Sequence, residues 1–207
     1  MTRILRLLQG NIMERNCITG VILAGGRSSR MGEDKGLVKA NGKPLFEHIA
    51  ERLRPQVGEI LISCNQNTEQ YGKEFRTVPD LIQNFSGPLA GMLAALTVSK
   101  TEWVLFVPCD VPGFPDNLAD AFLAEIAGQQ AAYARDPVRE HPTLCLLNRS
   151  LIPTLKTYLE NGDRKVMIFF NNIDAKTVLF QDASQFSNLN TQGDVLLWQN
   201  SQIGHPQ

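Results

Sequence analysis

Residues 18–24 form an apolar, β-branched segment (ITGVILA) that stops abruptly at Gly25 and Gly26. A segment of this kind predicts a buried strand that enters a loop. Further strand patterns occur at residues 59–65, 76–79, 103–108, 131–135, 143–148 and 177–180, and helical patterns at 44–53, 88–98, 116–127 and 151–160. This alternation predicts an α/β fold: one doubly wound, mostly parallel sheet of the Rossmann-like type, in three α/β/α layers. Ligands are then expected beyond the carboxyl ends of the strands.

Length and charge exclude several classes of protein. A chain of 207 residues that is 43% hydrophobic fits one domain, expected to span residues 1–207 with a poorly ordered extension at 1–16 and a tail at 201–207. Translation starts at Met1 or at Met13. The formal net charge of -1 gives no sign of a nucleic-acid partner. Apolar runs are far shorter than the roughly 20 residues of a membrane span. Four scattered cysteines favour free thiols and a cytoplasmic location.

The loop after the first strand is rich in glycine and cations. Residues 23–36 read LAGGRSSRMGEDKG and include Arg27, Arg30 and Lys35. Glycines let backbone N–H groups approach an anion closely, and the cations neutralise phosphate charge, which predicts a polyphosphate site. A solvated, flexible loop is the alternative. The loop matches neither the P-loop pattern nor the dinucleotide fingerprint.

Two aspartates follow predicted strands. Asp110, in PCD, ends the strand at residues 103–108, where a carboxylate can hold Mg²⁺ against phosphate oxygens. A turn aspartate is the alternative interpretation. Asp80, in VPD, has either a nucleotide or metal role or a purely loop-forming one.

Four further motifs have both a binding and a structural interpretation. Gly87 and Gly91 in SGPLAGM either offer backbone donors to an anion or serve the helix that follows. A loop histidine such as the one in REHPT is more often structural than catalytic. The RK pair of NGDRKVM lies at a helix start, where its positive charge is explained either by an anionic ligand or by exposure to solvent. The NLNT segment either binds ligand or fixes a turn. The residues concerned are Arg139, His141, Arg164, Lys165, Asn188 and Asn190.

Together, LAGG with RMG and DKG, GPLAGM, PCD, HPT, RKVM and NLNT resemble the molybdenum cofactor guanylyltransferases, over residues 18–199. The resemblance implies a nucleotidyltransferase that moves GMP from GTP to the terminal phosphate of molybdenum-bound molybdopterin and releases diphosphate, with Mg²⁺ as the required metal. It also implies a molybdoenzyme or its chaperone as recipient of the product.

The resemblance also implies roles for individual residues. The proposed GTP-binding set is Leu23, Ala24, Gly25, Lys35, Asn65, Asp80 and Asp110, with Asp110 also binding Mg²⁺ and Arg27 acting beside Lys35 and Asp110 in catalysis. The proposed molybdopterin side comprises Arg139, His141, Arg164, Lys165, Asn188 and Asn190. This family often has Asn-x-Asn where the chain has Ser63, Cys64 and Asn65, so one nucleotide contact is weakened at Ser63.

Two alternatives use the same cleft. One is another nucleotidyltransferase, either the cytidylyl enzyme for the same pterin or one that makes a sugar nucleotide; HPT, RKVM and NLNT, and preference for GTP over CTP, distinguish it. The other is a noncatalytic nucleotide sensor, which would bind GTP without releasing diphosphate. Residue chemistry itself indicates a nucleoside triphosphate, a metal and a phosphate acceptor, whereas guanine comes from the resemblance.

Overall fold

The structure is a computed structural model that describes residues 17–24, 34–81 and 87–203. The expected extension at residues 1–16 lies outside the described residues, as do Gly25 and Arg27 of the glycine-rich loop. Residues 201–203, expected in a tail, are helical, because the last helix ends at Ile203.

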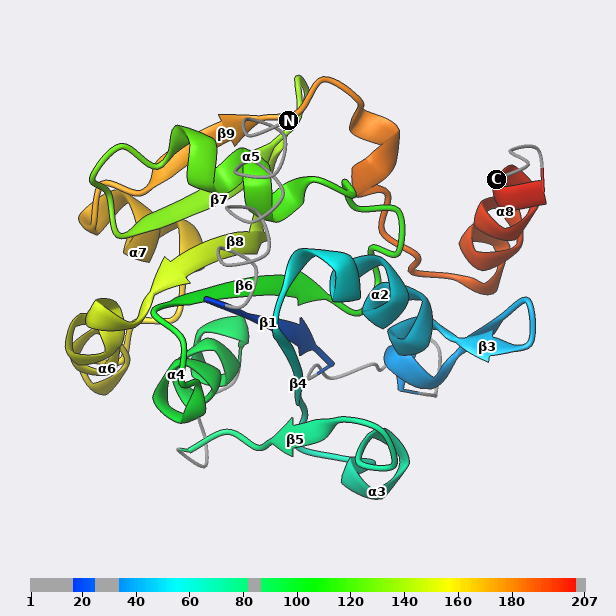
Figure 1. The fold of residues 1–207 in the computed structure, drawn as a ribbon, viewed down its shortest axis with the longest axis horizontal. Helices are drawn as coiled ribbons and strands as arrows, with labels where there is room; N and C mark the ends of the chain where they lie inside the picture. The colour runs from blue at the N-terminus through cyan, green and yellow to red at the C-terminus, as the bar shows by residue number, and fades with distance from the viewer. Residues whose placement is uncertain (1–16, 25–33, 82–86, 204–207) are drawn as a thin grey trace, which may run out of the picture.

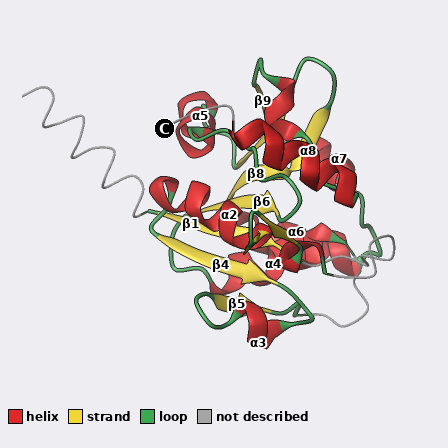
Figure 2. Cartoon of the chain, turned by 90° about the vertical axis from the view of Figure 1, so that its right-hand side faces the viewer, coloured by secondary structure: helices red, strands yellow, loops and turns green. Residues whose placement is uncertain are grey.

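One sheet of seven strands organises the chain. Its strands are β1 (Ile18–Leu23), β4 (Glu59–Ser63), β5 (Arg76–Val78), β6 (Trp103–Pro108), β7 (Ala131–Arg135), β8 (Glu140–Asn148) and β9 (Lys176–Leu179). They lie in the order β5-β4-β1-β6-β8-β7-β9, and the first five follow one another from bottom to top in Figure 2. Only β8 is antiparallel to its neighbours, and every other pair within the sheet is parallel. The predicted mostly parallel sheet is therefore confirmed.

Helices cover both faces of this sheet (Figure 1). The helices α2 (Leu45–Leu53) and α5 (Leu118–Glu125) share one hydrophobic core with the strands, and α4 (Pro88–Val98), α6 (Ile152–Glu160) and α7 (Val166–Asn172) share the other. Nearly all of α4 is buried, because it lies between the sheet and α6. The predicted three-layer arrangement is confirmed. Among the described residues, no helix is both long and apolar enough to cross a membrane.

Smaller elements complete the fold. The hairpin of β2 (Lys39–Ala40) and β3 (Lys43–Pro44) turns through Asn41 and Gly42, both with positive φ, as tight two-residue hairpins require. The short helix α3 (Thr68–Tyr71) follows β4, and α8 (Gln192–Ile203) packs on β2 and the start of α2. Sequence patterns did not predict α8, because its apolar side chains do not gather on one face.

Among the predicted boundaries that differ from the structure, two change the interpretation of a residue. The strand β8 begins at Glu140, three residues before its expected start, so His141 lies within a strand instead of a loop. Asp116 does not cap α5, which begins at Leu118 after Asn117. Asp116 instead accepts a 2.6 Å hydrogen bond from Arg52 of α2.

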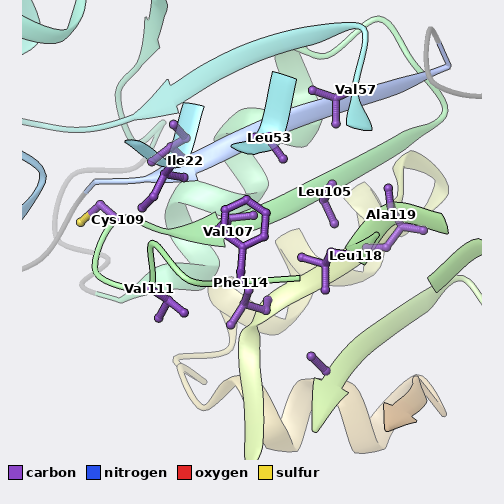
Figure 3. Close-up of a cluster of buried hydrophobic side chains, with 14 of the residues drawn as sticks. Ile22, Leu53, Val57, Leu105, Val107, Cys109, Val111, Phe114, Leu118 and Ala119 are labelled. Atoms are coloured by element: carbon purple, nitrogen blue, oxygen red, sulfur yellow. The ribbon is translucent and has the colours of Figure 1, made fainter. Parts of the chain in front are cut away.

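The segment that follows β6 is anchored in the hydrophobic core by buried side chains. Cys109, Val111 and Phe114 belong to the core shared with α2 and α5, and Figure 3 shows Phe114 close to Val107 of β6. Val111 is 1% exposed and Phe114 is fully buried. Because its neighbours on both sides are anchored in this way, the backbone at Asp110 is fixed.

Candidate active site

The carboxyl ends of four parallel strands lie level along one edge of the sheet. Leu23 of β1 pairs with Ser63 of β4 and with Pro108 of β6. Ser63 in turn pairs with Val78 of β5. The segments that follow these strands therefore leave the sheet at the edge where open α/β sheets bind ligands. Those that leave β4, β5 and β6 bring Asn65, Asp80 and Asp110 there.

Lys35 links two of these segments. Its Nζ donates hydrogen bonds to Oδ2 of Asp110, at 3.1 Å, and to Oδ1 of Asn190, at 2.7 Å. The Lys35 and Asp110 side chains are 24% and 17% exposed, so a ligand can reach both. The backbone is tied as well, since the Leu189 N–H donates to the Asp110 carbonyl at 2.8 Å. Residues far apart in sequence thus form one unit, which we call the Lys35–Asp110–Asn190 unit.

Asp34 fixes the backbone on which Lys35 lies. Its Oδ1 accepts from the Gly36 N–H at 3.1 Å and from the Tyr71 hydroxyl at 2.7 Å, while its Oδ2 accepts from Asn67 Nδ2 at 2.9 Å. Tyr71 is fully buried, and burial together with this hydrogen bond raises its pKa. A Cβ at Gly36 would lie in contact with the Tyr71 hydroxyl, so glycine is required there. The turn that carries Lys35 is therefore held rigidly on both sides of this residue.

Asn65 and Asp80 form a reciprocal pair across β4 and β5. Asn65 Nδ2 donates to Asp80 Oδ2, and the Asp80 N–H donates to Asn65 Oδ1, both at 2.8 Å. Burial raises the pKa of Asp80 above its ordinary value, although the hydrogen bond from Asn65 acts in the opposite direction. Burial therefore makes the ionised form of Asp80 less favourable, and such raised carboxyl pKa values are common at functional sites.

Ser63 is fully accounted for by packing. Its side chain is buried, and its Oγ lies so close to Gly91 of α4 that any Cβ at that position would collide with it. A larger residue at position 63 would displace the first turn of α4. The small serine therefore allows β4 and α4 to approach closely. The amide side chain at this edge is that of Asn65.

Beyond β6, a buried pair of hydrogen-bonded side chains lies where β7 turns into β8. Asp136 Oδ2 lies 2.8 Å from Nε2 of His141, and both side chains are at most 5% exposed. The hydrogen bond from His141, helped by bonds from the Val138 and Arg139 N–H groups, lowers the pKa of Asp136 to about 2. An ionised carboxylate only accepts hydrogen bonds, so Nε2 of His141 must carry a proton. The ring also stacks on Phe186, with centroids 4.5 Å apart.

Arg139 and Asn188 meet across this same edge. Arg139 Nη2 donates to Asn188 Oδ1 at 3.0 Å and to the Phe186 carbonyl at 3.2 Å. Further along the chain, Asp194 Oδ2 accepts from the N–H groups of Asn190 and Thr191, and these bonds lower the pKa of Asp194. Asp194 thereby caps the start of α8. The NLNT segment is thus held from both ends.

Arg164 and Lys165 lie where α6 passes into α7. Arg164 Nη1 donates to the carbonyls of Leu159 and Asp163 at the end of α6. Lys165 is the N-cap residue of α7 and exposed to solvent. Gly162, with a φ of 91°, ends α6 as expected.

The donor set suits a metal held partly by its substrate. Among the residues that the structure describes, no three His, Cys, Asp or Glu side chains gather into a metal-binding group. Mg²⁺ is commonly bound by one or two carboxylates together with substrate phosphates. A single carboxylate that is partly exposed and aligned beside a lysine, as Asp110 is, fits that mode.

Comparison with known proteins identifies the family. Residues 20–175 match the MobA-like NTP transferase domain family. The chain belongs to this family. The matched MobA-like region includes the sheet edge with Lys35, Asn65, Asp80 and Asp110 and ends before β9 and α8.

Close relatives and solved structures agree with this membership. The molybdenum cofactor guanylyltransferase of Serratia proteamaculans is 52% identical over 185 residues, covering 88% of this chain and 94% of that protein. The protein of the same name from Yersinia pseudotuberculosis is 49% identical over 190 residues, covering 90% and 97%. The crystal structure of molybdopterin-guanine dinucleotide biosynthesis protein A from Archaeoglobus fulgidus superimposes with a TM-score of 0.73 at 21% identity, covering 90% of this chain and all of that one.

The structure brings most of the predicted residues of this MobA-like chain to one edge. Lys35, Asp110 and Asn190 are in direct contact, Asn65 pairs with Asp80, and Arg139 binds Asn188. Leu23 and Ala24 lie at the end of β1. Gly25 and Arg27 lie outside the described residues. Roles for all these residues remain predictions.

Sequence reasoning missed Asp34 and Asp136. Asp34 stands two residues before Gly36, a spacing typical of an aspartate that accepts from a backbone N–H two residues on. Asp136 is followed by Pro137, a turn signal between two strand patterns. Pairing across that turn would have brought Asp136 and His141 together.

Proposed function

We propose that this protein transfers GMP from GTP to the terminal phosphate of molybdenum-bound molybdopterin, forming the guanine dinucleotide cofactor and diphosphate. The observation that best supports the chemistry is the Lys35–Asp110–Asn190 unit, a cation and a carboxylate held together at the carboxyl edge of the sheet. The choice of substrates is supported by relatives, 52% and 49% identical in sequence, that are named molybdenum cofactor guanylyltransferase.

The reaction is a displacement at the α-phosphorus of GTP. An oxygen of the pterin phosphate forms the new bond to that phosphorus, and the bond to the bridging oxygen of the diphosphate breaks. The attacking oxygen is already anionic at neutral pH, so no side chain has to remove a proton from it. The protein has to align the two phosphates and offset the negative charge that collects on the departing diphosphate.

Lys35 and Asp110 have complementary tasks in this scheme. Lys35 donates to phosphate oxygens of GTP, and its hydrogen bonds to Asp110 and Asn190 hold the ammonium group in place before substrate arrives. Arg27 adds positive charge. Asp110 would hold Mg²⁺ together with the phosphates of GTP, and the ion would supply Lewis-acid neutralisation of phosphate charge. We expect the backbone of Leu23, Ala24 and Gly25 to approach the nucleotide.

The remaining residues divide between the two substrates. Asn65 and Asp80, which present amide and carboxylate groups beside β4 and β5, would hold the nucleoside part of GTP. The molybdopterin side would be formed by Arg139, Arg164, Lys165, Asn188 and Asn190, with His141 buried behind them. The four cysteines are free thiols, which supports work in the reducing cytoplasm.

The test is a nucleotide panel. Purified protein is incubated with Mg²⁺, molybdenum-loaded molybdopterin and GTP, CTP, ATP or UTP, and both diphosphate and nucleotide-bearing pterin are measured. The proposal expects both products, in equal amounts, with GTP. Pterin product with CTP alone would replace guanine by cytosine, and GTP binding without diphosphate release would indicate a nucleotide sensor.

A further inference from the structure

The buried Asp136–His141 pair does more than fill space between β7 and β8. Asp136 uses both carboxylate oxygens: Oδ2 bonds His141, while Oδ1 accepts from the N–H groups of Val138 and Arg139 at 2.6 and 2.7 Å. The Asp136 N–H also donates to the Arg139 carbonyl at 2.9 Å. These bonds fix the turn from which the Arg139 side chain departs.

His141 and Arg139, the two residues that Asp136 bonds through its side chain, both contact the segment that reaches the candidate active site. The His141 ring stacks on Phe186 with an interplanar angle of 19°. Arg139, from the turn, binds the Phe186 carbonyl and Asn188. The next two residues of that segment are Leu189, whose N–H binds the Asp110 carbonyl, and Asn190, whose Oδ1 binds Lys35.

We propose that Asp136 is a positioning residue which, through His141 and Arg139, holds residues 186–190 against Asp110 and Lys35. The Asp136 carboxylate bonds the backbone N–H of Arg139 and the ring of His141, and these two side chains contact Phe186 and Asn188. The same segment then bonds Asp110 through Leu189 and Lys35 through Asn190. Asp136 touches no substrate itself. The kinetic part of this inference rests on the proposed function, whereas its structural part does not.

Asn148 provides a matched control. It is the last residue of β8, as His141 is the second, and it is similarly buried. Its side chain accepts from the Ser150 N–H at 2.9 Å and donates to Glu102 at 3.0 Å, so it also fastens a turn. It lies at the opposite edge of the sheet, because β8 runs antiparallel to β6. Loss of its bonds should therefore cost stability without reaching residues 186–190.

The experiment compares hydrogen–deuterium exchange at the Leu189 amide in the full-length protein and in Asp136→Ala, Arg139→Ala and Asn148→Ala. We expect Leu189 exchange about tenfold faster in the first two variants and unchanged in Asn148→Ala. Arg139 is exposed, so Arg139→Ala keeps the test decisive if Asp136→Ala does not fold. Unchanged exchange at Leu189 in folded Arg139→Ala, or equal acceleration in Asn148→Ala, would overturn the inference.

Kinetics with GTP provide the second readout. A smaller folded fraction lowers kcat without changing KM, whereas a displaced Lys35 changes both. We expect Asp136→Ala and Arg139→Ala to lower kcat about tenfold and to raise the KM for GTP, as small misplacements near reacting groups do. His141→Gln retains a donor near the Nε2 position and should recover most of the loss seen in His141→Ala. An unchanged KM in both Asp136→Ala and Arg139→Ala would contradict the positioning role. A wild-type protein with no GTP turnover would refute the proposed function and leave the exchange result to stand alone.

Discussion

The two halves of the sheet edge use polar side chains differently. In the parallel half, formed by β5, β4, β1 and β6, such side chains follow strand ends and stay partly exposed, as Asp80 and Asp110 do. In the mixed half, formed by β8, β7, β9 and residues 186–191, the carboxylate of Asp136 is buried against His141 and bonds backbone N–H groups. The parallel half leaves charged side chains partly exposed, where the proposed ligand would bind, whereas the buried carboxylate of the mixed half holds a backbone turn in place.

Removing charge from the parallel half should have the largest effect. We expect Lys35→Ala and Asp110→Ala each to lower turnover about a hundredfold or more, because a preorganised charge beside the reacting phosphate is lost. Diphosphate release under saturating GTP measures this. Lys43→Ala is the matched control, since Lys43 pairs with Glu51 at a more exposed site and should leave turnover unchanged. Near-normal turnover in folded Asp110→Ala would remove this residue from the mechanism.

Asp80 should show a conflict between stability and binding. Because burial raises its folded pKa, the ionised form is disfavoured in the folded protein, and stability increases as pH falls through the raised pKa toward the ordinary value of 3.8. We expect Asp80→Asn to weaken that pH dependence, to be no less stable at pH 7, and to raise the KM for GTP about tenfold. Urea unfolding at pH 5 and 7 with initial-rate kinetics tests both. A destabilised variant with wild-type KM would assign Asp80 to structure alone.

Two tyrosines compare a hydroxyl bonded beside the parallel half with one bonded away from it, on α6. Tyr71→Phe removes the hydroxyl bonded to Asp34 and should cost about 1–2 kcal/mol of unfolding free energy and lower kcat several-fold. Tyr158→Phe removes a comparable hydroxyl, which donates to the Lys165 carbonyl at 2.9 Å near α7. It should also reduce stability but leave kcat unchanged, which urea unfolding and the rate of diphosphate release at saturating GTP measure. Equal losses of kcat in the two variants would show that the Asp34–Tyr71 bond has no special part in positioning Lys35.

The smallest expected effect is the loss, at acid pH, of the stability that ionised Asp136 contributes to the folded protein. Its folded pKa of about 2 lies below the ordinary 3.8, so its contribution is present above pH 4 and is lost as pH falls through the range from about 4 to 2. The stability difference between the wild-type protein and Asp136→Asn should therefore shrink over that range. Thermal melting at several pH values measures it, and a difference independent of pH would contradict an ionised Asp136.

The parallel half was the predictable one. A strand that ends in a polar residue places that residue at a known edge, so Asp80 and Asp110 could be assigned from patterns such as VPD and PCD. This rule does not apply to β8, which runs antiparallel to β6, so its first residues and not its last lie at this edge. His141 was accordingly expected in a loop, and its pairing with Asp136 across the turn was not foreseen.

Long-range contacts account for the rest. Asn190 and Lys35 are separated by most of the chain, and no local pattern indicates that they bond. The helix α8 was also missed: Leu196 and Leu197 are exposed while Val195 is buried, so its sequence shows no apolar stripe. It is held by the Asp194 cap and by packing on the β2–β3 hairpin, which only the folded chain brings together.

The most direct test of the central claim follows the phosphates of GTP. Protein, Mg²⁺ and molybdenum-loaded molybdopterin are incubated with GTP labelled at the α-phosphate and, separately, at the γ-phosphate. The account predicts that the α label appears in the pterin product and the γ label in diphosphate, and that both transfers fall together in Asp110→Ala. Release of the γ label as inorganic phosphate, or an α label that never joins the pterin, would contradict guanylyl transfer at the Lys35–Asp110–Asn190 unit.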